Sequence, residues 1–402
     1  MCFVPESSVG IKDDPFYHLK NYYLKLWGQR DRIMFLCYII FILKLLGFVA
    51  RTVFIAKSMN NNEVILEISA IYPIPLLAVV KMAFLLIYRK QVHFLFETVA
   101  TKFWHIDLGG MVLHNYWRKR FFLINCLLLT HCVTSSLYVF LHLAFPDGSI
   151  PEGRTKWLPT LVSLPFNPDP SPLYQIMFFL LTWNMFISVF GNGFFDFFFV
   201  YAAQHLCAQF MVLKMVLKKL EFGVMEHCDD VDKFNSGRFQ EEVYGRLAVC
   251  IKHHTLLLRY GNELKNLSSI IFGVQLLTTL LTLVLMGYTL SENLEELAKS
   301  TMLLSFVFSS IMQFTIFAVQ SADIHDQSAS VAEAAYQCNW HLFNAKAKRG
   351  LTLLIMNSQK GISMYGAGLV AMDNEVIVKM AQKVFSFITL LRSLDEQRSV
   401  NK

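Results

Sequence analysis

Two groups of residues have side chains that could bind a metal ion. Cys250, His253 and His254 share one face of a predicted helix, and the run from His227 to Asp230 contains four possible ligands. Neither group has a second cluster at the spacing that a four-ligand zinc site needs. We therefore interpret both as solvated surface on the cytoplasmic side and expect no metal and no cofactor. The sequence also lacks zinc-protease, phosphate-loop, dinucleotide and nucleophile-elbow motifs, which argues against an enzyme.

A polar stripe near the C-terminus suggests a different chemistry, the passage of ions. Its members follow one another at steps of four and three residues, which places them on one line along a helix: Glu375, Lys379, Gln382, Ser386, Thr389 and Ser393. Polar groups at membrane depth are costly unless they face protein or water. Two interpretations stay open. The stripe is either a polar seam packed within the monomer or one wall of a pore that several subunits share.

The composition places the helix that carries this stripe in a membrane protein. Apolar residues make up 54% of the 402 residues and charged residues only 16%, whereas soluble chains carry about 25% charged residues. Apolar runs long enough to cross a bilayer recur along the chain, and we expect an all-α protein with seven transmembrane helices. The expected spans are 33–54, 64–88, 121–145, 173–205, 266–288, 302–324 and 368–391.

The basic residues predict the orientation of these spans, because loops rich in Lys and Arg stay on the cytoplasmic side. Of the 36 basic residues, 24 lie in the four odd-numbered segments outside the spans and 7 in the four even-numbered ones. This alternation predicts a cytoplasmic N-terminus and an extracellular C-terminus, with no signal peptide. The basic residues behind the net charge of +6 thus set the orientation of the spans and do not indicate a nucleic-acid-binding surface. We therefore expect no nucleic-acid partner. The eight cysteines fall in spans or on the predicted cytoplasmic side, where we expect thiols.

Two segments outside the spans have contrasting composition. Segment 146–172 contains seven of the eleven prolines and should form an ordered, non-helical extracellular cap. Segment 206–265 contains two stretches with helical periodicity, 211–222 and 241–265. We expect spans four and five to continue through them into the cytoplasm as long helices, with an acidic turn between them.

The C-terminal part of the chain resembles the insect odorant receptors. The matching residues are Ala335-Tyr336 with Trp340, Lys348-Arg349, Leu354-Ile355, Ser358-Gln359, Ala367-Gly368 and the run from Phe387 to Ser393. The closing Phe-x-Thr-Leu-Leu-Arg-Ser is the most specific of these features. Chain length, seven spans and an inside N-terminus fit the same family.

The resemblance implies a ligand-gated, non-selective cation channel in the plasma membrane of a sensory neuron. Such a channel is a hetero-tetramer with the shared odorant co-receptor, and the last helices surround one pore. The gate would fall on Thr389 and Ser393. An anchor helix at 331–356 would carry Tyr336, Trp340 and Phe343 on one face. The chain would then divide into 1–330, with spans one to six, and 331–402, with the anchor and the pore helix.

The resemblance also implies an odorant pocket in the outer half of spans two, three, four and six. The residues expected there are Ile68, Ile71, Tyr72, Pro75, Thr134, Leu137, Tyr138, Leu141, Phe178, Leu181, Thr182, Met185, Met302 and Phe306. No carboxylate, Lys or Arg is among them. A small apolar or aromatic volatile is therefore the expected ligand, and a charged one is disfavoured.

Other functions remain open at this stage. A gustatory receptor of the related insect family would share the topology but has a different closing motif. A G-protein-coupled receptor would need an extracellular N-terminus. A transporter built from inverted halves should show an internal repeat, which the sequence lacks.

Overall fold

Long helices make up most of the chain, because apolar side chains run through them with few breaks. The computed structural model describes residues 31–58, 72–144, 155–225, 229–292 and 297–400. The helices near the N-terminus are α2 (Asp31–Lys57), α4 (Pro73–Ile87), α5 (Arg89–Thr101), η1 (Ile106–Gly109) and α6 (Met111–Ala144). They are followed by α7 (Leu173–Lys218), α8 (Asp230–Asn235), α9 (Gly237–Glu292), α10 (Leu297–Tyr336), η2 (Trp340–Leu342), α11 (Ala345–Ser358) and α12 (Asn374–Val400).

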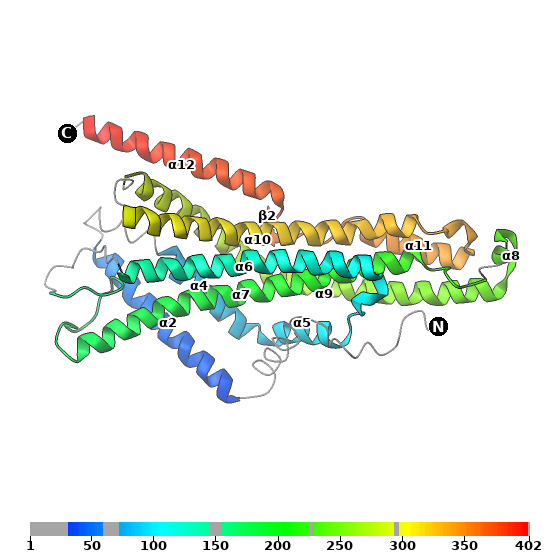
Figure 1. The fold of residues 1–402 in the computed structure, drawn as a ribbon, viewed down its shortest axis with the longest axis horizontal. Coiled ribbons are helices and arrows are strands. Elements are labelled where there is room, and N and C mark those ends of the chain that lie inside the picture. The colour runs from blue at the N-terminus through cyan, green and yellow to red at the C-terminus, as the bar shows by residue number, and fades with distance from the viewer. Residues whose placement is uncertain (1–30, 59–71, 145–154, 226–228, 293–296, 401–402) are drawn as a thin grey trace.

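The all-α seven-helix fold expected from the sequence is confirmed. Among the described residues, α2, α6, α7, α9 and α10 are long and apolar enough to cross a membrane, and α4 is a shorter apolar helix. The remaining span is α12, whose polar stripe lowers its hydropathy below that of the other helices. In Figure 1, α6, α7, α9 and α10 run along the long axis of the molecule, α2 crosses them obliquely, and α12 diverges from the bundle toward its C-terminal end.

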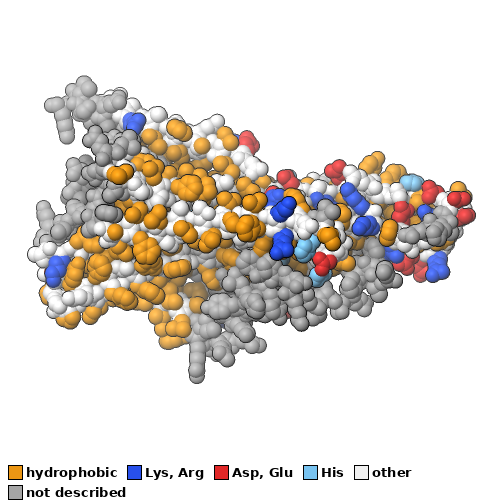
Figure 2. Space-filling view, viewed as in Figure 1, with side chains coloured by type: hydrophobic (Ala, Val, Ile, Leu, Met, Phe, Trp, Pro, Cys, Tyr) orange, Lys and Arg blue, Asp and Glu red, His pale blue; other side chains and the backbone are white. Residues whose placement is uncertain are grey.

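Three helices are too long to lie wholly in the bilayer. α7 has 46 residues, α9 has 56 and α10 has 40. At about 1.5 Å per residue they measure roughly 60–85 Å, about two to three times a hydrocarbon core of roughly 30 Å. Their far ends, with α8 and α11, form the narrower part of the molecule, where charged side chains gather, whereas hydrophobic side chains cover much of the broad end (Figure 2). We call this narrower part the stalk. The expected continuation of spans four and five into long helices is confirmed.

An aromatic cluster joins these three helices at the centre. Phe199 of α7, Phe272 of α9 and Phe317 of α10 are fully buried, with ring centroids 4.8–5.5 Å apart. Such ring pairs stabilise the packing by about 0.5–1.5 kcal/mol each beyond the area they bury. The three long helices are thus tied together at one level of the bundle.

The expected start of the seventh span at residue 368 was wrong. A two-stranded antiparallel hairpin precedes the helix, formed by β1 (Tyr365–Gly366) and β2 (Val370–Ala371), with Gly366 opposite Val370. The helix begins at Asn374 because the Asp373 carboxylate accepts a hydrogen bond from the Val376 backbone N–H at 3.0 Å. It then continues to Val400, nine residues beyond the expected end.

The expected single anchor helix at 331–356 was also wrong. α10 continues through residue 331 and ends at Tyr336, so a domain boundary after residue 330 falls inside a helix. A separate helix, α11, begins at Ala345, because the side chain of Asn344 accepts a hydrogen bond from the Ala347 N–H at 2.9 Å. The short η2 lies between them. Tyr336 and Trp340 are exposed and Phe343 is buried, so the three do not share one face.

Two further elements differ from or extend the expectations. The described part of the proline-rich segment, residues 155–172, contains no helix, as expected, and residues 146–154 lie outside the described residues. Helix α5 was not predicted, although its buried residues Val92, Leu95, Phe96 and Val99 follow helical spacing.

Candidate functional site

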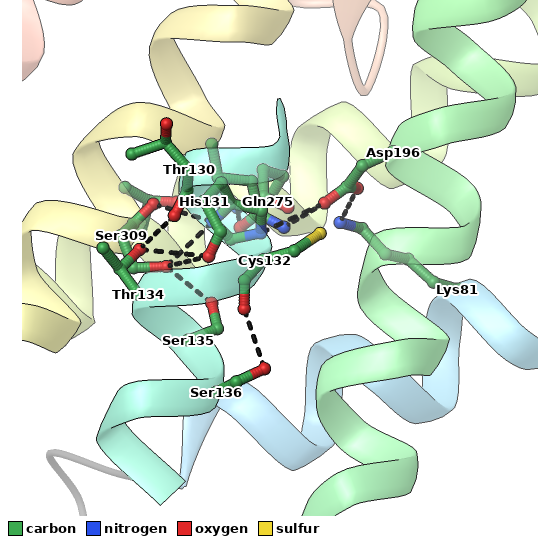
Figure 3. A network of polar contacts seen from close by, with 12 residues as sticks. Lys81, Thr130, His131, Cys132, Thr134, Ser135, Ser136, Asp196, Gln275 and Ser309 are labelled. Carbon is green, nitrogen blue, oxygen red and sulfur yellow. Dashed lines mark hydrogen bonds and ion pairs between the residues drawn. The ribbon is translucent and has the colours of Figure 1, made fainter. Parts of the chain in front are cut away.

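A buried ion pair lies at the centre of the membrane-spanning bundle. The Lys81 ammonium on α4 is 2.5 Å from the Asp196 carboxylate on α7, and both side chains are almost fully buried. The other carboxylate oxygen of Asp196 accepts a hydrogen bond from the Gln313 amide on α10 at 2.5 Å. Ionised groups at membrane depth are expensive unless they are paired, and they usually mark function. Figure 3 shows this pair beside a wider polar network.

The network continues through α6, α9 and α10. His131 lies 3.6 Å from Asp196, and its ring Nδ1 is 2.8 Å from the Ser309 hydroxyl. Ser309 and Ser135 share a hydrogen bond of 2.6 Å, and the Gln275 amide donates to Gln313 at 3.0 Å. Five helices therefore meet at one connected set of polar side chains (Figure 3).

A cavity opens beside this network, toward the end of the bundle where α6 ends and α7 begins. It has a volume of about 90 Å³ and is lined by residues of α2, α4, α6, α7, α9 and α10. Its polar lining includes Ser135, Asn184, Ser188, Asn192, Thr282, Ser310 and Gln313. Tyr138, Met185 and Phe306 supply an apolar wall. A concave site with an apolar wall and convergent polar groups is typical of small-molecule binding.

Two basic side chains of α2 also line this cavity, which the sequence analysis did not anticipate. The Lys44 ammonium is 3.0 Å from the Asn184 side-chain oxygen and 2.5 Å from the Ser188 hydroxyl. Arg51 lies two helical turns further along and lines the same cavity as Tyr138. The cavity lining therefore contains positive charge, whereas the residue set expected from the sequence had none.

The expected pocket residues divide into several groups in the structure. Four of them line the cavity: Pro75, Tyr138, Met185 and Phe306. Leu141 and Met302 pack in the cluster around Tyr138 and Phe306. Ile68 and Ile71 lie outside the described residues.

The remaining described residues of the expected pocket do not line the cavity. Phe178 and Leu181 pack with Leu158 and Val162 of the proline-rich segment. Tyr72 is half-buried, with its hydroxyl 3.0 Å from that of Thr52. Thr134 and Thr182 are half-buried, and Leu137 faces outward.

The polar stripe on α12 is solvent-exposed along its whole length in the monomer. All six residues expected to line a pore (Glu375, Lys379, Gln382, Ser386, Thr389 and Ser393) are exposed. The opposite face of α12 packs on the bundle, with Val376 and Met380 buried in the core. The interpretation of the stripe as a seam packed within the monomer was therefore wrong. Along the stripe, Lys379 and Glu375 form an exposed ion pair of 3.0 Å.

The possible metal ligands in the stalk are buried, so their interpretation as a solvated face was wrong. Cys250, His253 and His254 are each at most 5% exposed. His253 stacks on Trp104 with ring centroids 3.7 Å apart, and its Nε2 is 3.0 Å from the Gln209 amide oxygen. Burial lowers the pKa of His253 to about 3 and that of His254 to about 4, which keeps both rings neutral.

In the second possible cluster, the run from His227 to Asp230, the described side chains are exposed. Asp229 and Asp230 are exposed, and His227 and Cys228 lie outside the described residues. In the part of the chain that the structure describes, no three His, Cys, Asp or Glu side chains come together as a metal site. The described cysteines (Cys37, Cys126, Cys132, Cys207, Cys250 and Cys338) are free thiols.

Sequence reasoning missed most of the polar residues at the centre, although a signal for them existed. Lys44, Arg51 and Lys81 all lie within expected spans, where a charge is costly and therefore informative. Asp196 lies in the fourth span and is the natural partner of one of them. Which lysine pairs with it depends on helix packing, which spacing along the chain does not reveal.

Comparison with known proteins shows which family has this sequence pattern. A family profile described as 7tm odorant receptor matches residues 60–385. The chain is 24% identical to odorant receptor Or2 of Anopheles gambiae over 78% of this chain and 80% of that protein. It is 26% identical to odorant receptor 82a of Drosophila melanogaster over 60% of this chain and 58% of that one. A shorter match, 24% identical, covers 36% of this chain and 30% of the odorant receptor co-receptor of Ooceraea biroi.

The fold is similar to that of a solved structure. The insect olfactory receptor OR5 from Machilis hrabei, in complex with eugenol, superposes with a TM-score of 0.75 at 12% identity. The alignment covers 95% of this chain and all of that one. At this level of identity the match establishes a shared fold.

Proposed function

This chain belongs to the 7tm odorant receptor family, and we propose that it is the odorant-binding subunit of a ligand-gated, non-selective cation channel. The family consists of membrane receptors and not of enzymes. In the proposal, a small ligand enters the cavity between α2, α4, α6, α7, α9 and α10. Binding there opens a pore that the α12 helices of several subunits enclose.

The exposed stripe of α12 is the observation that carries the channel proposal. An apolar, lipid-facing surface would be expected on a transmembrane helix at the edge of a monomer, yet six polar residues line one edge of α12 without packing on the described part of the chain. Such a surface needs water or a partner of its own kind. Several copies around one axis would give both, because each stripe would then face a shared aqueous path. Thr389 and Ser393 are proposed to lie at the gate.

The stalk is the proposed site of assembly with the co-receptor. Exposed Tyr336 and Trp340 lie at its end, with their rings 6.2 Å apart. Aromatic residues at protein interfaces often contribute much of the binding energy. The excess of basic residues on this side supports a cytoplasmic stalk and an extracellular end for α12. We propose a hetero-tetramer with co-receptor subunits in the plasma membrane of a sensory neuron.

A functional division of the chain accompanies this proposal. Residues 1–330 would supply the ligand cavity, and residues 331–402 would supply part of the stalk and the pore helix. Because α10 crosses the boundary as one helix, the two parts are mechanically linked. The hairpin before α12 lies against α9, with the Ala367 N–H donating to the Ser269 carbonyl at 2.7 Å. Movement of α9 or α10 around the cavity could therefore reach α12 directly.

Currents recorded with and without the co-receptor test the proposal. We expect odorant-evoked cation current only when this chain and the co-receptor are expressed together, and no change when G-protein signalling is blocked. Surface labelling of the chain controls for expression. Strong responses without the co-receptor, or responses lost on G-protein block, would contradict the proposal. Saturable uptake of the ligand without current would instead indicate a transporter.

A further inference from the structure

Two basic side chains of α2, those of Lys44 and Arg51, line the cavity but are not paired with the carboxylate of the central polar network. Lys44 is 1% exposed and donates hydrogen bonds only to neutral oxygens, those of Asn184 and Ser188. Arg51 lies on the same face of α2, about 10 Å further along the helix axis.

No acidic residue among the described residues lines this cavity. The nearby carboxylate, Asp196, already contacts Lys81 at 2.5 Å and Gln313 at 2.5 Å. Its charge is thus largely balanced by Lys81. A buried cation without a counterion is strongly disfavoured, and the penalty falls when an anion arrives. The cavity lining therefore carries a net positive charge that a ligand could neutralise.

A third polar side chain in the cavity, that of Asn192, has one atom without a partner among the described residues. Asn192 is 7% exposed and lines the same cavity, and its side-chain oxygen has no hydrogen-bond partner among the described residues. An amide can turn either its oxygen or its N–H donors toward a ligand. A buried polar group without a partner in a cavity is an indication of a missing ligand atom.

From these three observations we propose that the cavity binds an odorant that carries a carboxylate. The carboxylate accepts hydrogen bonds from Lys44 and Arg51, which are charge-assisted and therefore strong. The apolar part of the ligand lies against Tyr138, Met185 and Phe306. The small size of the cavity favours a short acid over a long one. This inference rests on the proposed function, since it names the ligand class of the same site.

The proposal replaces the expectation of a neutral, apolar ligand. That expectation came from a residue set drawn from spans two, three, four and six, which contained no basic residue. The structure adds α2 to the cavity wall, and α2 supplies both cations. A carboxylate loses much hydration on entering the cavity, and two charged donors offset that loss, whereas an alcohol gains much less from them.

Binding to the purified complex with the co-receptor tests the ligand class separately from gating. The probes are hexanoate and its neutral counterparts of equal chain length, hexanol and hexanal. We expect hexanoate to raise the thermal unfolding midpoint at concentrations at least about tenfold lower than hexanol, and to evoke current in the same order. Arg51→Gln should weaken hexanoate binding by about tenfold or more and change hexanol binding by less than about twofold.

Two further variants keep the test interpretable. Arg51→Lys retains the charge and should keep most of the preference for the acid. Lys57→Gln removes an exposed basic residue of the same helix that does not line the cavity, and should change nothing. Loss of the acid preference in Lys57→Gln, or equal effects of Arg51→Gln on acid and alcohol, would overturn the proposal.

The outcomes also separate this inference from the proposed function. Neutral odorants that open the channel while hexanoate neither binds nor activates would overturn the ligand class and leave the channel intact. Hexanoate binding that Arg51→Gln abolishes, without current from any ligand, would support the ligand class and contradict the channel.

Discussion

Leu137 and Tyr138 are neighbours on α6 with opposite surroundings. Tyr138 is 4% exposed, lines the cavity and lies 4.9 Å from the ring of Phe306, whereas Leu137 is 43% exposed on the outer surface. We expect Tyr138→Ala to raise the half-maximal odorant concentration by about tenfold or more, since losing an apolar contact costs about 1–3 kcal/mol. Leu137→Ala, the matched control, should leave it unchanged. Odorant dose–response currents measure both, and equal shifts would place the ligand elsewhere.

Lys81 and Asp196 should behave as a unit. Removing one partner of a buried ion pair costs about 3–5 kcal/mol, because the other charge stays buried without compensation. Lys81→Met should therefore lower the thermal unfolding midpoint of the purified protein clearly. The double variant Lys81→Met with Asp196→Asn should recover much of the loss, since Asn still accepts a hydrogen bond from Gln313. If the double variant is no more stable than the single one, the pair is not the stabilising contact inferred here.

At the scale of single residues, the sequence indicated charges in the membrane but not their partners. Lys44, Arg51 and Lys81 stand out in apolar runs without any structure. Helix packing determines that Lys81 meets a carboxylate and Lys44 meets only neutral oxygens. The expectation of a neutral ligand left α2 out of the cavity, and the proposed carboxylate ligand differs from it because α2 is included.

Helix α9 carries the hairpin that precedes α12, and one glycine makes this contact possible. A Cβ atom on Gly273 would lie 2.6 Å from the Ala367 Cβ and 3.0 Å from the Ala367 backbone nitrogen. Gly273→Ala should push the hairpin away, lower the unfolding midpoint and weaken odorant-evoked current. Gly245→Ala is the matched control on the same helix, since its Cβ would meet nothing within 4 Å.

In the control variant, alanine should leave stability equal or raise it, because alanine favours helix over glycine by about 1 kcal/mol. Thermal unfolding and current amplitude of both variants, at matched surface expression, give the comparison. A Gly273→Ala protein as stable and as active as Gly245→Ala would show that the contact with the hairpin does not position α12.

The buried histidines of α9 predict a loss of stability in acid. Their folded pKa values, about 3 for His253 and about 4 for His254, lie below the ordinary value of 6.5. Between these values the unfolded chain binds protons that the folded chain does not, so stability falls as the pH drops from about 6.5 toward 4. We expect the unfolding midpoint to be lower at pH 5 than at pH 7.

Replacing the histidines isolates their contribution. His254→Gln can keep a hydrogen bond to the Ser358 hydroxyl, which now lies 3.2 Å from the imidazole, and should reduce the dependence on pH. His341→Gln alters an exposed histidine and should not. An unchanged pH dependence in His254→Gln would mean that other groups cause the acid sensitivity.

At the scale of elements, periodicity predicted the long helices well and their ends poorly. The apolar runs of α7, α9 and α10 identify these helices, because a run of about 20 apolar residues is long enough to cross a bilayer as a helix. Local caps determine where helices stop. The side chain of Asp373 caps the start of α12, and that of Asn344 caps the start of α11. Each is a single polar residue inside a segment for which the sequence predicted one uninterrupted helix. The hairpin at 365–371 gave no periodic signal.

In the proposed function, ligand binding, assembly and permeation belong to different parts of the molecule. The cavity is lined by helices of the apolar part. The charged stalk projects from that part, and α12 diverges on one side (Figures 1 and 2). A monomer of this shape leaves the polar stripe of α12 without a partner among the described residues. That stripe was found from its spacing alone, whereas its exposure in the monomer needed the structure. An assembly of subunits around the α12 helices would give each polar stripe a partner or a shared aqueous path.

Accessibility of α12 to a water-soluble thiol reagent in the working channel tests the central claim most directly. Ser386 lies on the stripe, and its neighbour Phe385 is exposed on an apolar side of the same helix. A membrane-impermeant, positively charged thiosulfonate, applied while odorant holds the channel open, should block the current of Ser386→Cys and leave that of Phe385→Cys and the unsubstituted channel unchanged. Block of Phe385→Cys instead, or no modification at Ser386→Cys in conducting channels, would contradict a pore lined by this stripe.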